Sequence, residues 1–266
     1  MPRATRWEEL TYEELKKLAE EGAVAIIPLG SLEVHGPHLP LGTDYMVAHR
    51  VALEVAKREK AVVLPPIAYA YVPENRHFAG AVTLSGDTLT RLLEEVCDEV
   101  YRNGFKRILV LNGHGGNARV LRLFVREMMR KRKRYLLYVL TDPLAPMAAV
   151  IDRVRETDVY GHAGEIETSI VLYVRPDLVK LERVRGGARL GPRRVLEHVD
   201  AMADWVCYAL EGFVGDPTKA SADKGRVLFE ALVEAVAEIV RRIREDREYE
   251  RVMAEYYARA YPSGEG

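Results

Sequence analysis

The amino-acid sequence predicts an α/β protein with a mainly parallel central sheet. Apolar runs of strand length alternate with longer segments in which apolar residues recur every three or four positions, as in amphipathic helices. This alternation is typical of βαβ units, whose strands run parallel. The 266 residues are enough to bury a full core, and α/β domains often reach this length. Since no repeat or linker divides the chain, we expect one domain over residues 1–266, with a disordered tail at 262–266.

Each expected element has its own local signal. Thr11 and Glu14 form a capping box for the first helix, and Ser85 or Asp87 caps the third. The expected strands are the apolar runs 23–29, 61–64, 107–111 and 135–140. The expected helices cover residues 12–20, 46–56, 88–102, 118–132 and 169–174, with one or two long helices within 220–257. Residues 69–82 are interpreted as a lid or a subunit contact, and residues 143–160 as an active-site loop. Residues 203–215 could form either a helix or a strand.

The composition excludes several classes of function. A hydrophobic content of 48% and a charged content of 30% are typical of a globular rather than a disordered protein. The net charge of −1 gives no general attraction to nucleic acid or to an anionic membrane. The N-terminal residues are polar and no apolar run is long enough to span a bilayer, so we expect a cytoplasmic protein. Cys97 and Cys207 are too few for a disulfide framework and are expected to be buried thiols.

The amide content suggests adaptation to heat. The sequence has no Gln and only four Asn, while Glu, Lys and Arg are abundant. Proteins of heat-adapted organisms are depleted in thermolabile amides in the same way. We therefore expect a thermophilic source.

The densest group of chemically active side chains lies in residues 30–44, directly after the first apolar run. This loop carries Glu33, His35, His38 and Asp44. In open α/β sheets, ligands bind at this position, beyond the carboxyl end of a strand. Carboxylate and imidazole together are ligands of Zn, Mn and Fe. The loop therefore predicts a metal site.

Each of these residues also has an alternative role. In an extended segment Glu33 and His35 share a face and can reach one or two adjacent metal ions, although they could instead brace the turn. Asp44 can bridge two metal ions, and it can also cap the following helix. His38 is interpreted either as a support for the ligands or as a structural residue.

Two further clusters follow apolar runs or precede helices. His114 lies in Asn-Gly-His-Gly-Gly-Asn at 112–117, where the glycines could present amides to an anion. Because the segment lacks the spacing of a Walker loop or a dinucleotide fingerprint, a ligand histidine fits better. In the third cluster Glu165 is a candidate ligand, His162 a proton shuttle or substrate contact, and Glu167 a helix cap. All three clusters should converge on one edge of a parallel sheet.

The order of these motifs resembles the creatininase (creatinine amidohydrolase) family. The resemblance rests on Gly-Ser-x-Glu-x-His-Gly-Pro-His-Leu-Pro, then Asn-Gly-His-Gly-Gly-Asn, then Gly-His-Ala-Gly-Glu-x-Glu-Thr, within residues 30–168. It implies a three-layer α/β/α fold, a dinuclear metal site, hydrolysis of amide C–N bonds, and homo-oligomers that are often hexamers. By motif position, Glu33 and His114 would hold one metal ion and His35 the other, with Asp44 between them.

The sequence departs from true creatininases in two places. Creatininases have a Glu in the segment that reads Gly115-Gly116 here, and they lack the Glu of the His-Ala-Gly-Glu motif. The resemblance therefore implies that Glu165 supplies the missing ligand from another loop. Creatininases also place tryptophans near the substrate, whereas Trp7 and Trp205 lie outside those loops. Both departures argue against creatinine as the substrate.

Other members of this family offer alternative substrates. One removes formate from 2-amino-5-formylamino-6-ribosylaminopyrimidin-4(3H)-one 5'-monophosphate in archaeal flavin and deazaflavin synthesis, and another is a peptidase-like maturase of a peptide-derived cofactor. The heat-adapted composition favours the archaeal deformylase. A phosphorylated substrate would need cationic contacts, and the arginines available in candidate loops are Arg76, Arg185 and Arg189, which could equally be surface residues. The sequence assigns no role to His77.

The resulting hypothesis is a metal-dependent amidohydrolase. Two divalent ions, Zn, Fe(II) or Mn, would share a water, lower its pKa and direct the hydroxide to an amide or formamide carbon. His162 would pass the proton to the leaving nitrogen. The alternatives are a creatinine or other cyclic-amide hydrolase, a non-catalytic protein that binds metal or a phosphorylated ligand, and an oligomer in which the histidines only stabilise interfaces.

Overall fold

The fold is a parallel sheet covered by helices on both faces. The computed structural model describes residues 5–192 and 196–261. Within them the strands β1 (Val24–Leu29), β2 (Ala61–Val63), β3 (Arg107–Asn112) and β4 (Leu136–Leu140) form one sheet in the order β2-β1-β3-β4. All three neighbouring pairs are parallel. The predicted α/β class with a mainly parallel sheet is confirmed.

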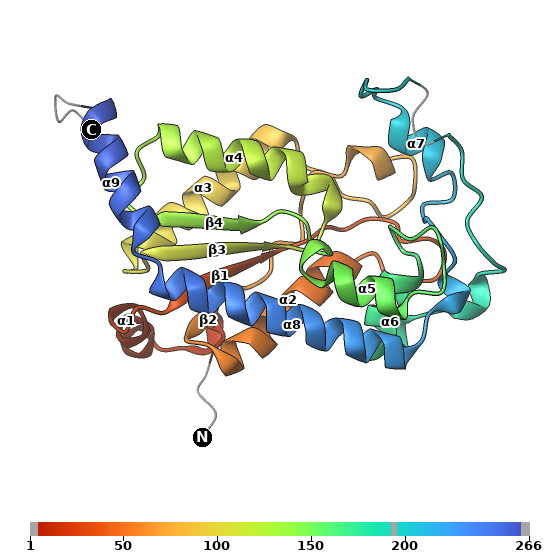
Figure 1. Cartoon of the computed structure of the whole chain (residues 1–266), viewed down its shortest axis with the longest axis horizontal. Helices are drawn as coiled ribbons and strands as arrows, with labels where there is room; N and C mark the ends of the chain where they lie inside the picture. Colours follow the sequence, from red (N-terminus) through yellow and green to blue (C-terminus); the bar gives the residue numbers. More distant parts are fainter. Residues whose placement is uncertain (1–4, 193–195, 262–266) are drawn as a thin grey trace.

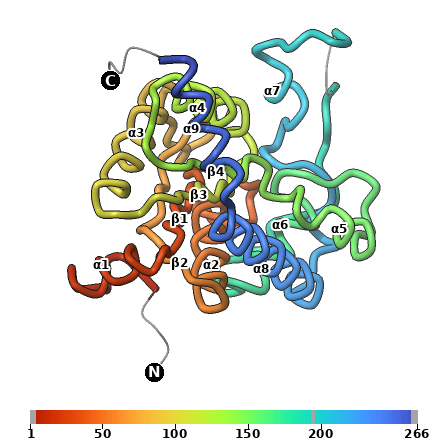
Figure 2. The backbone as a smooth tube through the Cα atoms, turned by 60° about the vertical axis from the view of Figure 1, so that its left-hand side comes forward, coloured from red at the N-terminus to blue at the C-terminus, as the bar shows by residue number. Residues whose placement is uncertain are grey.

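The side chains of the strands alternate between two apolar layers. In β1, Val24 and Ile26 pack on one side, and Ala25, Ile27 and Leu29 pack on the other. The first layer is covered by α2 (Thr43–Arg58), α5 (Ala148–Val154), α6 (Glu165–Val174) and α8 (Ala222–Glu245). The second is covered by α1 (Tyr12–Glu20), α3 (Gly86–Arg102) and α4 (Ala118–Arg130). Figures 1 and 2 show the resulting three-layer arrangement.

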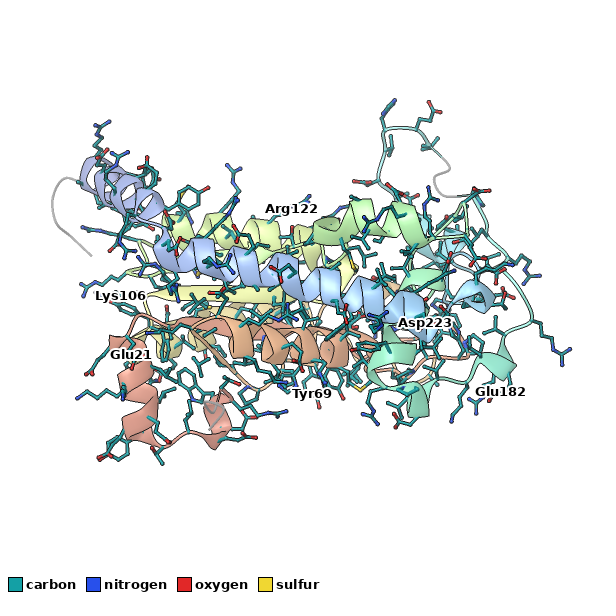
Figure 3. The ribbon with its side chains drawn as sticks, turned by 60° about the horizontal axis from the view of Figure 1, so that its bottom comes forward. Glu21, Tyr69, Lys106, Arg122, Glu182 and Asp223 are labelled. Carbon is teal, nitrogen blue, oxygen red and sulfur yellow. The ribbon has the colours of Figure 1, made fainter. Side chains whose placement is uncertain are left out.

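The chain leaves β1 and β3 towards opposite faces of the sheet. From β1 it continues through α2 on one face, and from β3 through α4 on the other face. Leu29, the last residue of β1, pairs with Asn112, the last residue of β3. The carboxyl ends of these two central strands therefore form a topological switch point, the usual place for a ligand site in an open α/β sheet. Lys106, which precedes β3, lies at the opposite end of the molecule from Glu182 (Figure 3).

Most expected elements are present, with three informative differences. The capping box of Thr11 and Glu14 is formed, and Ser85 rather than Asp87 caps α3. The N-cap of α2 is Gly42, so the capping role considered for Asp44 is wrong. The segment expected to be an active-site loop at 143–160 contains α5, and the ambiguous segment at 203–215 contains the short helix α7 (Asp204–Tyr208).

The remaining expectations concern the termini and the cysteines. The long C-terminal segment forms α8 and α9 (Glu248–Ala260), while the predicted disordered tail at 262–266 lies outside the described residues. Cys97 is a buried free thiol as expected, but Cys207 is only half-buried. Among the described residues, no helix combines the length and the apolarity that crossing a membrane requires. The extent of the domain stays a prediction.

Candidate metal centre

A buried cluster of carboxylates and imidazoles lies where β1 and β3 end. Two glycines allow the first turn of α2 to approach these strand ends. A Cβ on Gly30 would stand 2.2 Å from the backbone nitrogen of Tyr45, and one on Gly113 would stand 2.5 Å from the carbonyl oxygen of Asp44. The cluster comprises Glu33, His35, Asp44 and His114, whose exposed fractions are all 5% or less. Four residues predicted from two different segments are thus brought together.

Asp44 stands between the two histidines of the cluster. Its Oδ1 lies 2.9 Å from His35 Nε2, and its Oδ2 lies 3.1 Å from His114 Nδ1. The Ser31 hydroxyl, 2.7 Å from Oδ2, donates a further hydrogen bond. Burial raises the pKa of Asp44, but the two histidines outweigh burial and hold that pKa well below its usual range. Each carboxylate oxygen therefore faces a different imidazole, as a bridging ligand requires.

Glu33 completes the group on the side of His114. Its Oε1 lies 2.6 Å from His114 Nδ1, and its Oε2 accepts a hydrogen bond of 2.5 Å from Asn75 Nδ2. His35, two residues further along the extended loop, points into the same cluster, as the spacing predicted. Both members of the Glu33-x-His35 pair therefore reach one centre.

The electrostatics of the cluster favour a bound cation. Burial alone would lower the pKa of His35, but Asp44 and Glu33 outweigh it and raise that pKa to about 10. Burial would also lower the pKa of His114, but Glu33 and Asp44 outweigh burial and raise that pKa well above the usual value. The buried carboxylates are therefore stabilised by a positive charge close to them. Divalent ions would supply this charge, and the imidazoles would bind the ions in the neutral form.

The two asparagines of the Asn-Gly-His-Gly-Gly-Asn motif hold His114 in place. Asn112 Nδ2 donates to the carbonyls of His114 and Thr141 at 2.7 and 2.8 Å, and Asn112 Oδ1 accepts from the His114 amide at 3.2 Å. Asn117 donates to the same Oδ1 at 3.0 Å. The glycines allow the turn several backbone conformations, and this hydrogen-bond network stabilises one of them.

Glu165 is not brought to this cluster. Its carboxylate accepts hydrogen bonds from the amides of Glu156 and Thr157, each at 2.9 Å, from Thr157 Oγ1 at 2.6 Å, and from Lys224 Nζ at 2.6 Å. Burial raises the pKa of Glu165, but Lys224 and Thr157 outweigh it and lower that pKa. With its acceptor sites used by these donors, Glu165 fits a structural role and not the ligand role predicted for it.

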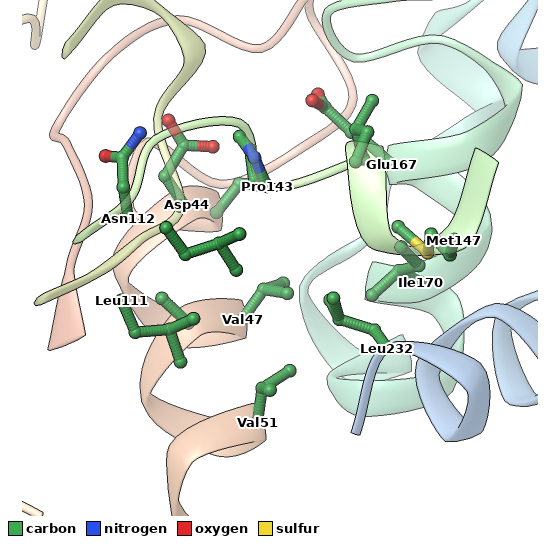
Figure 4. Close-up of a pocket in the computed structure, with 15 residues that line it drawn as sticks. Asp44, Val47, Val51, Leu111, Asn112, Pro143, Met147, Glu167, Ile170 and Leu232 are labelled. Atoms are coloured by element: carbon green, nitrogen blue, oxygen red, sulfur yellow. The ribbon is translucent and has the colours of Figure 1, made fainter. Parts of the chain in front are cut away.

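Glu167, predicted only to cap a helix, lies at the cluster instead. Its Oε2 accepts a hydrogen bond of 2.6 Å from the Ala163 amide and lies 3.7 Å from His35 Nε2. Burial raises its pKa. In Figure 4 the carboxylates of Asp44 and Glu167 stand on the same side of a small apolar cavity of about 40 Å³. Of the two glutamates in the first turn of α6, Glu167 is therefore the one that lies beside the cluster.

His162 lies beside His35 at the edge of the centre. Its Nε2 donates a hydrogen bond of 2.7 Å to the carbonyl of Val34, which leaves Nδ1 as the ring's acceptor. Its ring centroid is 4.2 Å from that of His35. Trp205, on α7, contacts His162 edge-on at 5.6 Å, so a tryptophan does approach the site, contrary to the expectation from sequence.

His38 belongs to the structural support of the site. Its Nε2 donates to Thr168 Oγ1 at 2.9 Å, and that hydroxyl donates to the Ala163 carbonyl at 3.0 Å. Burial lowers the pKa of His38 to about 4. Of the two roles considered from sequence, the structural one fits this contact between the 30–44 loop and α6.

Glu74 is a member of the site that the sequence did not reveal. It lies in the three-residue 3-10 helix Pro73–Asn75, and its Oε1 is 3.8 Å from His114 Nε2. Within the described residues two triads have ligand atoms within 4.8 Å of one another: Glu33, His35 and His162, and Glu33, Glu74 and His114. Arg76, His77, Arg185 and Arg189 are exposed, and nothing in their contacts assigns them a role.

Comparison with known proteins identifies the family. The family model described as creatininase, creatinine amidohydrolase, matches residues 8–240. The chain belongs to the creatininase family. A mycofactocin precursor peptide peptidase of Mycolicibacterium smegmatis is 34% identical over 84% of this chain and 87% of its own length. The creatinine amidohydrolase of Pseudomonas putida is 29% identical over 88% of this chain and 95% of its own length.

Solved structures agree with this assignment. A crystal structure of creatinine amidohydrolase has a TM-score of 0.78 at 29% identity and covers 90% of this chain and 97% of its own. A mutant creatininase of the Zn-Zn type and a Mn form of creatininase have TM-scores of 0.77 and 0.76 at 28% and 27% identity, and each covers 90% of this chain and 98% of its own. The predicted family, hydrolase activity and divalent-metal cofactors are confirmed. A formylaminopyrimidine nucleotide deformylase of Methanococcus maripaludis is 33% identical but matches only 36% of this chain and 42% of its own length.

Proposed function

We propose that this protein hydrolyses a C–N bond other than a peptide bond, in a small amide or formamide, at a two-metal centre. Glu33, His35, Asp44, His114 and Glu167 would hold the metal ions. The observation that carries this proposal is Asp44, which offers one buried oxygen to each of two imidazoles. The donor set fits divalent ions of the Zn, Mn and Fe(II) type, and the sequence does not choose among them.

The side chains around the centre supply positioning and proton transfer. A pair of divalent ions provides, when bound, Lewis acidity and a water of lowered pKa. His162 is held by Val34 through Nε2, so Nδ1 can accept a proton and deliver it to the leaving nitrogen. Trp205 packs edge-on against the His162 ring and helps to fix its orientation. Glu165 takes no part in the chemistry in this account.

Within this class we propose the formamide of the formylaminopyrimidine nucleotide as the first substrate to test. Arg76 and His77 follow Glu74 on the same loop and are exposed, so they are available to a phosphate. Partial similarity to archaeal deformylases and the absence of Gln support this choice. The alternatives are creatinine or another cyclic amide, favoured by the relative from Pseudomonas putida, and a peptide bond, favoured by the mycobacterial peptidase.

The experiment is a comparison of substrates on one metal-loaded preparation. Protein equilibrated anaerobically with Fe(II), Mn(II) or Zn(II) is assayed for formate release from the formylaminopyrimidine nucleotide, for creatinine ring opening, and for cleavage of a short peptide. The proposal expects formate release, with creatinine and peptide turned over at least tenfold more slowly. Tight metal binding without turnover of any amide would favour the non-catalytic binding protein instead.

The assembly and the heat adaptation stay predictions of the same account. We propose a homo-oligomer, with a hexamer as the expected size, which light scattering on a sizing column measures. A melting midpoint above the range of about 45–65 °C common in mesophile domains would support a thermophilic source. A midpoint below about 60 °C would count against it.

A further inference from the structure

The space at position 116 is already occupied in this chain. A Cβ built on Gly116 would stand 2.3 Å from His114 Nε2 and 2.7 Å from Glu74 Oε1. Both distances are shorter than non-bonded contacts allow, so no side chain fits there while His114 and Glu74 keep their places. Position 116 is where the family resemblance expects a glutamate. The volume that such a side chain would enter is filled here by the His114 ring and by a carboxylate from another loop.

The carboxylate of Glu74 faces an imidazole nitrogen that has no partner. His114 is 4% exposed, and its Nε2 makes no hydrogen bond to any described residue. Glu74 Oε1, at 3.8 Å, is too far for a hydrogen bond to this nitrogen. A buried polar atom left without a partner is rare in proteins and calls for an explanation. A metal ion shared between Nε2 and the Glu74 carboxylate would provide it, while Nδ1–H of the neutral imidazole donates to Glu33 and Asp44.

Hydrogen bonds on both sides of Glu74 in the chain hold its loop against neighbouring segments. The Tyr71 amide donates to Asn117 Oδ1 at 3.2 Å, and the Val72 amide donates to Thr83 Oγ1 at 2.8 Å. Asn75, next to Glu74, donates to Glu33 at 2.5 Å. The 3-10 helix is therefore a fixed wall of the centre, so the position of Glu74 is set by the fold rather than by a mobile surface loop.

We propose that Glu74 supplies the metal-binding carboxylate that Gly116 lacks. The ligand is delivered by the segment after β2 instead of the turn after β3. The inference rests on the proposed two-metal centre and specifies its remaining ligand. It replaces the role that the sequence gave to Glu165. Gly116 in the His114 turn then has a physical purpose, because it leaves room for the incoming carboxylate.

The test is metal binding rather than turnover. Wild type, Glu74→Gln and the matched control Glu182→Gln, which makes the same change on another three-residue 3-10 helix, are stripped of metal and equilibrated with Zn(II) alone. Metal per chain is measured by mass spectrometry, and the affinity of each ion by competition with a chromophoric chelator. We expect two ions in wild type and Glu182→Gln. In Glu74→Gln one ion should bind at least tenfold more weakly, since even partners of ligands contribute roughly 10–100-fold.

A second variant keeps the inference testable if Glu74→Gln folds poorly. The exchange variant Glu74→Gly with Gly116→Glu moves the carboxylate to the turn and removes the contact with Glu74, so that only the His114 ring has to shift to admit the new side chain. We expect it to recover the second ion, and Gly116→Glu alone to bind metal less tightly than wild type. Two equally tight ions in wild type and in folded Glu74→Gln would overturn this inference alone. Absence of metal from the wild type would overturn the two-metal centre as well.

Discussion

Two segments of the site carry the same spacing of polar residues and use it differently. Glu33 and His35 lie two residues apart in extended chain, and both reach the metal centre. Glu165 and Glu167 also lie two residues apart, but on the first turn of α6, and only Glu167 reaches it. In extended chain, residues i and i+2 share a face, whereas on a helix they point in nearly opposite directions. Secondary structure therefore decides which members of a polar pair can act together.

The first test of this comparison replaces Glu33 and His35 one at a time. Glu33→Gln and His35→Asn should each weaken metal binding and turnover by more than the roughly 10–100-fold that outer partners of ligands contribute. The reason is that both side chains face the same centre. Metal content and formate release are measured side by side, with Glu13→Gln on α1 as a control for charge. Full metal content in either variant would contradict the shared-face interpretation.

His162, which precedes α6, should affect chemistry without affecting metal content. We expect His162→Ala to lower turnover by roughly a hundredfold, within the range for general acid–base catalysis, because Nδ1 no longer accepts a proton. Metal per chain should stay at the wild-type value. Loss of a metal ion instead would make His162 a ligand, and unchanged turnover would remove its catalytic role.

Replacing Glu165 should lower the stability of the fold, whereas replacing Glu167 should weaken metal binding. Glu165→Gln removes one of the two carboxylates paired with Lys224, and because Glu156 remains the free energy of unfolding should fall by less than the roughly 3 kcal/mol typical of a fully broken buried pair. Urea unfolding measures this loss, while metal content should not change. Glu167→Gln should do the reverse, with weaker metal binding and a small change in stability.

A matched double variant sharpens this separation. In Glu165→Gln with Lys224→Met, both charges are absent, so much of the lost stability should return. If Glu165→Gln instead removes metal without loss of stability, then Glu165 is a ligand and the assignment of the helical pair is reversed.

The smallest expected effect concerns His38, which joins the two segments through Thr168. Its pKa in the folded protein is about 4, below the ordinary value of 6.5. Between these values only the unfolded chain takes up the proton, so stability falls as the pH is lowered from 6.5 towards 4. The contribution reaches about 1.4 kcal/mol per pH unit. Urea unfolding of metal-free wild type and His38→Gln should show a smaller fall in the variant; equal slopes would mean that His38 is not buried in its neutral form.

Local patterns predicted the fold because its strands and helices have strong periodicity and recognisable caps. The same patterns placed Glu33, His35, Asp44 and His114 at one sheet edge, since parallel strands bring their carboxyl ends together. The choice between Glu165 and Glu167 depended on where α6 begins, and helix boundaries are the least certain part of a sequence prediction. Glu74 and Trp205 come from a three-residue 3-10 helix and from α7, which have no periodic signal. Their approach to the site depends on tertiary packing alone.

The most direct test of the two-metal account is the metal content of Asp44→Asn. Asp44 offers one oxygen to each side of the centre, at 2.9 Å from His35 and 3.1 Å from His114. Protein stripped of metal and equilibrated with Zn(II) should contain two ions per chain in the wild type. In a folded Asp44→Asn variant both ions should weaken together. Two tight ions in the variant, or none in the wild type, would contradict the account.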